Sequence, residues 1–170
     1  MLDSSYGGNS MAKITALIHT CNDGRRIARA LESLRACDEL LVIDHGSSDD
    51  SVRAARRHGA TVKEAVPGVD RGVYAVDARH DWILCLLANE AASEAMEATL
   101  FEWKEAYPDD APDSAGFAFA LRQESESGWQ SLPPETRLVN RRQLRWEGGL
   151  PPNSPQSTLL EGAILRFHQP

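Results

Sequence analysis

Short aliphatic runs that alternate with helix signals constrain this chain more than any other feature of its sequence. Residues 14–19, 39–44 and 82–87 are almost entirely apolar, and residues 61–65 form a weaker and slightly shorter run. Such continuous runs are typical of strands buried on both faces. Apolar residues at helical spacing follow the first run, namely Ile27, Ala30, Leu31 and Leu34. Strands that alternate with helices predict right-handed crossovers and a mostly parallel sheet.

The second part of the chain has a different character. Residues 96–107 place Met96, Leu100, Trp103 and Tyr107 on one face of a helix that ends near Pro108. Beyond it, residues 116–122, 137–140 and 163–168 read as short strands between Ser-, Gly- and Pro-rich turns. The pattern therefore predicts an α/β fold whose sheet carries flanking helices, followed by a shorter β-rich C-terminal half.

Two segments lack a regular pattern. Residues 66–79 contain Pro67, Gly68 and Gly72, which favours a loop before a short helix. Residues 1–12 are mostly polar and rich in Gly and Ser, so we expect a disordered N-terminal tail. A length of 170 residues suits one domain, which we assign to residues 13–170.

Composition excludes several classes of protein. The net charge of −7 argues against a nucleic-acid partner, because phosphate backbones are bound by clustered cations. No apolar run approaches the roughly 20 residues that cross a bilayer. The three cysteines show no CxxC spacing, which indicates neither a zinc site nor a disulfide framework. We expect a cytoplasmic protein, at most peripheral to the inner face of the membrane.

Polar side chains follow the apolar runs, and ligands of open parallel sheets bind at the carboxyl ends of the strands. The residues at these positions are Thr20, Cys21, Asn22 and Asp23 after the first run, Asp44 to Asp49 after the second, and Asn89 with Glu90 after residues 82–87. The sequence predicts that these side chains share one edge of the sheet. Asp44 and Asp49 are also compatible with plain turn and helix-cap roles.

These segments resemble family 2 glycosyltransferases. Ile18 to Asp23 resembles the family's opening strand and its Pro-Thr-Tyr-Asn-Glu turn. Leu41 to Val52 resembles the strand, the Asp-x-Gly-Ser-x-Asp turn and the helix start that follow. Thr136 to Arg142 with Trp146 to Gly148 loosely resembles a late segment of the branch that builds lipopolysaccharide core and other cell-surface glycans.

The resemblance implies a GT-A fold and an inverting transfer of sugar from a nucleotide-sugar donor to a cell-surface glycan or lipid-linked acceptor. The residues expected to bind the nucleotide of a UDP-sugar are Thr20, Asn22, Asp44, Ser47 and Asp49. Asp44 would accept the imide N–H of uracil.

The chain departs from the family where chemistry is expected. The family holds Mg²⁺ or Mn²⁺ through an Asp-x-Asp motif, and this chain has Leu87-Ala88-Asn89 there. Asn89 and Glu90 are the remaining oxygen donors for a metal or a diphosphate, and the lost carboxylates weigh against a metal. Asn89 is equally suited to cap a following helix. The family's His-Glu pair is absent too, which leaves Glu147 as the candidate general base and Glu135 as a second.

Two other readings stay open. A catalytically inactive relative that binds nucleotide or a protein partner explains the lost motifs. An unrelated small hydrolase is disfavoured, because the chain has no nucleophile elbow. Cys21 lacks the arginine that a phosphatase cradle requires, so we expect an unreactive, buried or half-buried thiol, and we expect His45 to point to solvent.

Overall fold

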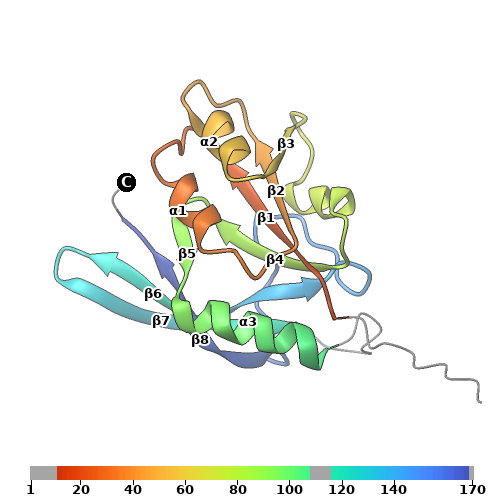
Figure 1. Ribbon diagram of the computed structural model, residues 1–170, viewed down its shortest axis with the longest axis vertical. Helices are drawn as coiled ribbons and strands as arrows, with labels where there is room; N and C mark the ends of the chain where they lie inside the picture. Colours follow the sequence, from red (N-terminus) through yellow and green to blue (C-terminus); the bar gives the residue numbers. More distant parts are fainter. Residues whose placement is uncertain (1–10, 108–115, 169–170) are drawn as a thin grey trace, which may run out of the picture.

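The computed structural model describes residues 11–107 and 116–168. Within them, the strands form one sheet in the order β3-β2-β1-β4-β7-β6-β8-β5 (Figure 1). The parallel part comprises β1 (Ile14–Thr20), β2 (Glu39–Asp44), β3 (Thr61–Glu64) and β4 (Trp82–Leu87). All four match the predicted runs within one residue. The expected α/β fold is confirmed.

The β-rich half extends the same sheet. It comprises β6 (Phe117–Ser125), β7 (Gly128–Asn140) and β8 (Thr158–Arg166). The short strand β5 (Glu90–Ala92) precedes α3 and joins this part of the sheet by pairing antiparallel with β8. β7 pairs antiparallel with β4 and with β6, and β6 pairs parallel with β8. Consequently β6 and β8 run in the same direction as β1 and β4, and their carboxyl ends lie at the same edge of the sheet.

Helices cover one face of the sheet. They are α1 (Ile27–Glu32), α2 (Ser51–Arg57) and α3 (Glu94–Ala106), whose apolar sides join the larger core cluster. Around Trp82, rings from α3 and β6 meet mostly edge to face. The other face is covered by the 3₁₀ helix η1 (Arg71–Asp77) and by Trp146, which form a second cluster. Among the described residues, no helix has the length and apolarity to cross a membrane.

Three predicted boundaries were wrong, namely those of the N-terminal tail, of β7 and of β8, which begins at Thr158 and not at residue 163, and one strand was missed. Ala12 is buried, and its N–H donates to the carbonyl of Lys104 over 2.9 Å, so the fold includes part of the predicted tail. Residues 1–10 lie outside the described residues. β5 was missed because its three residues are too few to show a period. β7 begins well before the predicted residue 137, in a polar stretch that only its pairing with β6 makes a strand.

Candidate functional site

The turns that follow β1 and β2 are joined by hydrogen bonds. Thr20 and Asp44 are direct neighbours across the two strands. The N–H of Asn22 donates to Ser47 Oγ over 2.9 Å, and the N–H of Ser48 donates to Asn22 Oδ1 over 2.8 Å. Asn22 has a φ of 56°, a left-handed conformation that asparagine tolerates better than most residues. The structure thus brings together the side chains that the sequence placed at this edge.

Asp49 ties the second turn to the start of α1. Its carboxylate accepts the N–H of Gly24 over 2.9 Å and the N–H and hydroxyl of Ser51, the first residue of α2. These bonds, the Ser51 hydroxyl first, hold the pKa of Asp49 below its ordinary value. Asp49 therefore links the loops that precede α1 and α2, while Asp50 holds the N-cap position of α2. Because its carboxylate is exposed, it remains reachable by a ligand.

Asp44 and Thr20 are buried beneath these turns. Both carboxylate oxygens of Asp44 lie 3.2 to 3.3 Å from the Ser47 N–H, and the Thr20 hydroxyl donates to Asp23 over 3.0 Å. Most polar atoms of the predicted nucleotide-binding residues are thus already bonded to residues of the two turns. The network fixes the shape of the edge, and Asn22, Ser48 and Asp49 are its exposed members.

A cavity of about 360 Å³ adjoins this edge at the carboxyl ends of β2 and β3. It is lined by His45, Gly46, the loop 65–69 and Arg71. The Val66 N–H donates to the Tyr74 hydroxyl, so the loop is tied to η1. Sequence reasoning missed Arg71 and the loop. The only signal was an arginine inside an irregular segment, and nothing in the pattern showed that η1 folds back onto the sheet.

His45 and His19 form an imidazole pair beside this cavity. His19 Nδ1 lies 2.8 Å from His45 Nε2, and the ring of Tyr74 contacts His19 edge-on. Burial, then the nearby His45 and Arg71, lower the pKa of His19 to about 4. Burial and Arg71 lower the pKa of His45 too. Both rings are therefore neutral at pH 7. The expectation that His45 points to solvent was wrong, because the ring turns inward to His19.

Cys21 also departs from its prediction. The residue is exposed, not buried, and its thiol donates to the carbonyl of His45 over 3.4 Å. The buried cysteine is Cys85, within β4, where burial raises the pKa of the thiol to about 12.

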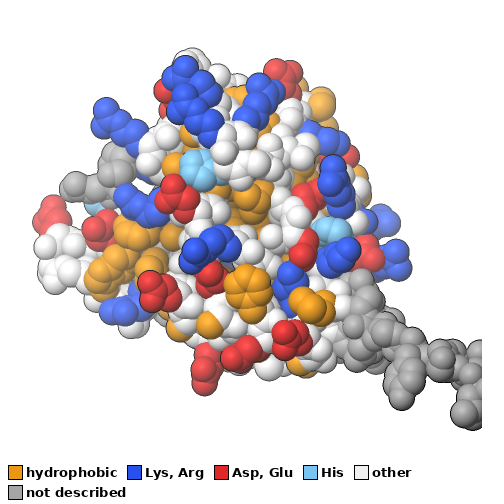
Figure 2. Space-filling view, in the orientation of Figure 1, with side chains coloured by type: hydrophobic (Ala, Val, Ile, Leu, Met, Phe, Trp, Pro, Cys, Tyr) orange, Lys and Arg blue, Asp and Glu red, His pale blue; other side chains and the backbone are white. Residues whose placement is uncertain are grey.

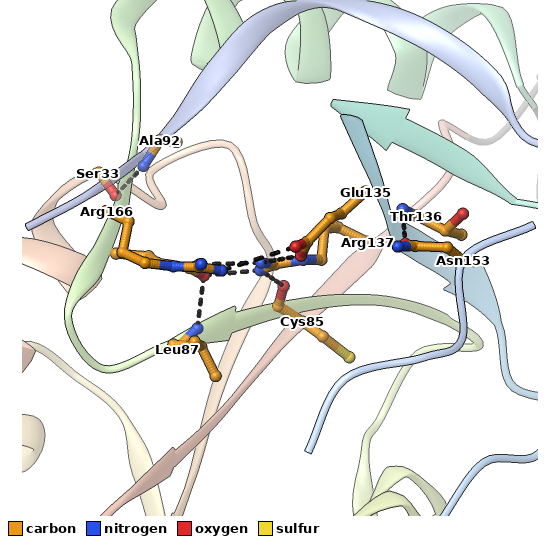
Figure 3. A network of polar contacts seen from close by, with 10 residues as sticks. Ser33, Cys85, Leu87, Ala92, Glu135, Thr136, Arg137, Asn153 and Arg166 are labelled. Atoms are coloured by element: carbon orange, nitrogen blue, oxygen red, sulfur yellow. Dashed lines mark hydrogen bonds and ion pairs between the residues drawn. The ribbon is translucent and has the colours of Figure 1, made fainter. Parts of the chain in front are cut away.

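Glu90 is sealed inside the fold. Its carboxylate lies 2.6 and 2.9 Å from the two terminal nitrogens of Arg137, and Arg166 donates to it as well (Figure 3). The Leu87 N–H adds a bond over 2.9 Å. Burial alone would raise the pKa of Glu90, but Arg137, Leu87 and Arg166 more than offset it and lower the pKa. Glu90 is therefore an internal counter-ion, and the prediction that it holds a metal or diphosphate does not fit.

Asn89 is likewise engaged. Its side-chain amide donates to the carbonyl of Phe167 over 3.2 Å, and its own carbonyl accepts the Phe167 N–H over 2.9 Å. The alternative role as a helix cap is also wrong. β5 follows instead, and Ser93 caps α3 by accepting the N–H of Met96.

The donor set at the end of β4 does not suit a divalent cation. Such ions need free carboxylate oxygens, and here Leu87 has none while Glu90 is neutralised by two arginines. Across residues 11–107 and 116–168, no three His, Cys, Asp or Glu side chains gather as a metal site. We therefore assign no chemical step to a metal ion.

Of the two candidate bases, Glu147 lies beside η1, and Glu135 is paired with arginines. Glu147 is exposed beside η1, and its carbonyl accepts the Gly72 N–H over 3.0 Å, next to Arg71. Glu135 forms an ion pair with Arg137 at 2.6 Å and lies 3.8 Å from Arg166. Glu147 thus has an exposed carboxylate on the segment that contacts η1, while Glu135 belongs to the network around Arg137.

The architecture is that of the GT-A glycosyltransferases: a mostly parallel sheet with flanking helices and polar turns at the carboxyl ends of its first strands. Among solved structures, residues 1–349 of Staphylococcus aureus TarS share this fold, with a TM-score of 0.51 and 18% sequence identity. The match covers 71% of this chain and 38% of that one.

Two sequence relatives are longer proteins that this chain matches only in part. The chain is 38% identical over 91 residues to an uncharacterized glycosyltransferase of Rickettsia felis, which covers 51% of this chain and 32% of that protein. It is 28% identical over 169 residues to a TPR repeat-containing protein of Synechococcus elongatus, covering 95% of this chain and 39% of that protein. No family model matches the chain. The chain thus spans about a third of the length of these relatives.

Proposed function

We propose that this chain is a glycosyltransferase domain of the family 2 type that binds a nucleotide-sugar, with UDP as the nucleotide, at the carboxyl ends of β1, β2 and β3. Its activity is the inverting transfer of the sugar to a cell-surface glycan or lipid-linked acceptor. The protein works in the cytoplasm, at the inner face of the membrane when its acceptor is lipid-linked.

The observation that carries the proposal is the cavity beside the joined turns. His45 and Arg71 offer polar contacts, and loop 65–69 with Gly46 offers an apolar wall. A cavity of this kind suits the flat base and ribose of a nucleotide. In the proposal, Asp44 accepts the uracil imide N–H, Thr20, Asn22 and Ser47 keep the edge in shape, and Asp49 lies at its rim. Glu147 serves as the general base.

Calorimetric titration with UDP and UDP-glucose tests the proposal. We expect UDP to bind, and Arg71→Ala to weaken binding about tenfold through the loss of one charged contact. Arg57→Ala is the matched control, because Arg57 is an exposed arginine at the end of α2 and lies away from the cavity. Equal losses in both variants, or no UDP binding by the unmodified chain, would contradict a nucleotide site here.

A second function is favoured by one observation. Because Glu90 is sealed by Arg137 and Arg166, the end of β4 offers no free carboxylate to a metal. A catalytically inactive relative would keep the nucleotide site and lose only turnover. Release of glucose from UDP-glucose distinguishes the two, since UDP binding without any release or transfer supports the inactive relative. Glu147→Gln should abolish release in an active enzyme and leave UDP binding unchanged.

A further inference from the structure

Trp129 differs from the other tryptophans of this chain. Trp82, Trp103 and Trp146 are 1, 4 and 8% exposed and belong to the core, whereas Trp129 is 41% exposed at the start of β7. A single exposed aromatic residue needs no explanation by itself. Trp129, however, has neighbours from two other parts of the chain, and one of them is contacted in turn by a residue of α1.

These neighbours form one cluster on the sheet. Trp129 pairs directly with Glu124 across β6 and β7, so the two side chains share a face. The ring of Phe167, which follows β8, meets Trp129 nearly perpendicularly at 5.3 Å between centroids. Arg29 from α1 lies over Phe167 at 4.0 Å from its ring centre. We call Trp129, Phe167, Glu124 and Arg29 the Trp129 cluster. Figure 2 shows hydrophobic side chains gathered beside the β6–β7 hairpin, at the left.

Topology places the cluster at the edge that carries the candidate site. β6 and β8 end at the same edge as β1 and β2, and β7 begins there. The hairpin projects from this edge (Figure 1). Phe167 is hydrogen-bonded through its backbone to Asn89, the residue that follows β4. The Trp129 cluster therefore lies next to the end of β4, at the same edge of the sheet as the candidate site.

We propose that the Trp129 cluster binds a sugar unit of the acceptor glycan; this inference rests on the proposed function. The apolar C–H face of a pyranose packs on an aromatic ring, while its hydroxyl groups need nearby polar partners. Glu124 supplies a carboxylate beside the indole and Arg29 a guanidinium beside Phe167. A flat ring with flanking charged groups suits a polyol better than an extended apolar partner.

The four indole N–H groups make a direct test, because each gives its own signal in a ¹⁵N–¹H correlation spectrum. Methyl α-D-glucoside, methyl β-D-galactoside and methyl α-D-mannoside are titrated into the full chain without nucleotide. We expect at least one glycoside to move the Trp129 signal with a Kd on the order of millimolar, typical of one weakly held sugar. The three buried indoles should stay still.

Variants separate recognition from general packing. Trp129→Ala should abolish saturation transfer from protein to glycoside, and Glu124→Gln should weaken binding about tenfold. Phe101→Ala is the control, since Phe101 is 44% exposed on α3 outside the cluster, and it should have no effect. Failure of all three glycosides to move Trp129, or undiminished binding by Trp129→Ala, overturns the inference. If UDP binds normally in that case, the proposed function stands. If glycosides move Trp129 while UDP does not bind, the nucleotide site alone is refuted.

Discussion

Arg137 and Glu90 face each other through two hydrogen bonds, of 2.6 and 2.9 Å, and neither side chain is exposed. The pair joins β7 to the start of β5, and Arg166 extends it to β8. Removing one partner of a buried pair leaves an uncompensated charge, which typically costs about 3–5 kcal/mol. We expect Glu90→Leu to lower the free energy of unfolding by about 3 kcal/mol, because Glu135 still pairs with Arg137. Urea denaturation of the unmodified chain and of Glu90→Leu measures this difference in the free energy of unfolding.

A double variant checks the cause of that loss. In Glu90→Leu/Arg137→Met both buried charges are replaced by apolar groups, so the double variant should be more stable than the Glu90→Leu single variant. Glu32→Leu, at an exposed glutamate of α1, is the control and should change stability by less than about 1 kcal/mol. A double variant at least as unstable as the single one would show that packing, not the buried charge, sets the loss.

His19 should make stability depend on pH. Its pKa of about 4 in the folded chain lies below the ordinary value of 6.5, so the unfolded chain takes up the proton first. The neutral His19 ring therefore contributes to the free energy of unfolding, and this contribution is fully present above pH 6.5. It is lost as the pH falls toward 4, by up to about 3 kcal/mol. Urea denaturation between pH 4.5 and about 7 measures it, and His19→Asn should flatten the dependence.

His58 provides a control of opposite sign. Its hydrogen bond to the Ala54 carbonyl, and then its contact with Glu32, raise its pKa. The contribution of His58 to the free energy of unfolding is therefore present below the pKa that His58 has in the unfolded chain, and it is lost as the pH rises. His58→Gln should make the acid loss of stability steeper than in the unmodified chain. A flatter curve in His58→Gln, or an unchanged one in His19→Asn, would contradict these assignments.

Gly72 should be required for the position of Arg71. A Cβ at Gly72 would lie 1.9 Å from the carbonyl oxygen of Trp146, closer than any real contact. Gly72→Ala should therefore push η1 off the sheet, destabilise the chain by about 2–4 kcal/mol and weaken UDP binding. Gly148→Ala is the control, because a Cβ there meets its nearest atom at 3.7 Å. Thermal unfolding and calorimetry report the two effects, and equal behaviour of the two variants would count against this packing.

Manganese should not improve nucleotide binding. With Glu90 neutralised and Asn89 bonded to Phe167, the end of β4 offers no free carboxylate. We expect the Kd of UDP to change by less than about twofold when Mn²⁺ is added, well under 1 kcal/mol. Leu87→Asp should restore part of a metal response, because it puts a free carboxylate where the chain has none. Tenfold tighter binding of UDP to the unmodified chain with Mn²⁺ would refute the assignment.

The sequence was most informative where local pattern and burial agree. The aliphatic runs of β1, β2 and β4 are buried on both faces, so their composition alone marks them as central strands. The sequence placed Asn22, Asp44, Ser47 and Asp49 in the turns for a similar reason, since short polar residues after such strands form the turns that end them. β5 and the outer part of β7 were not found, because only pairing with β8 and β6 makes them strands.

The arrangement of the candidate site depended on tertiary structure more than the arrangement of the strands did. The order of strands and helices, set by local hydrophobic pattern, determined the GT-A type of fold and the edge at which we propose that a ligand binds. Long-range contacts decided what each polar group at that edge is free to do. They turned Glu90 toward Arg137, joined His45 to His19, and brought Arg71 and Trp129 to the edge from distant segments. The physical reason is that a charged or polar side chain buries only with a partner, and partners far apart in sequence meet only in the folded chain.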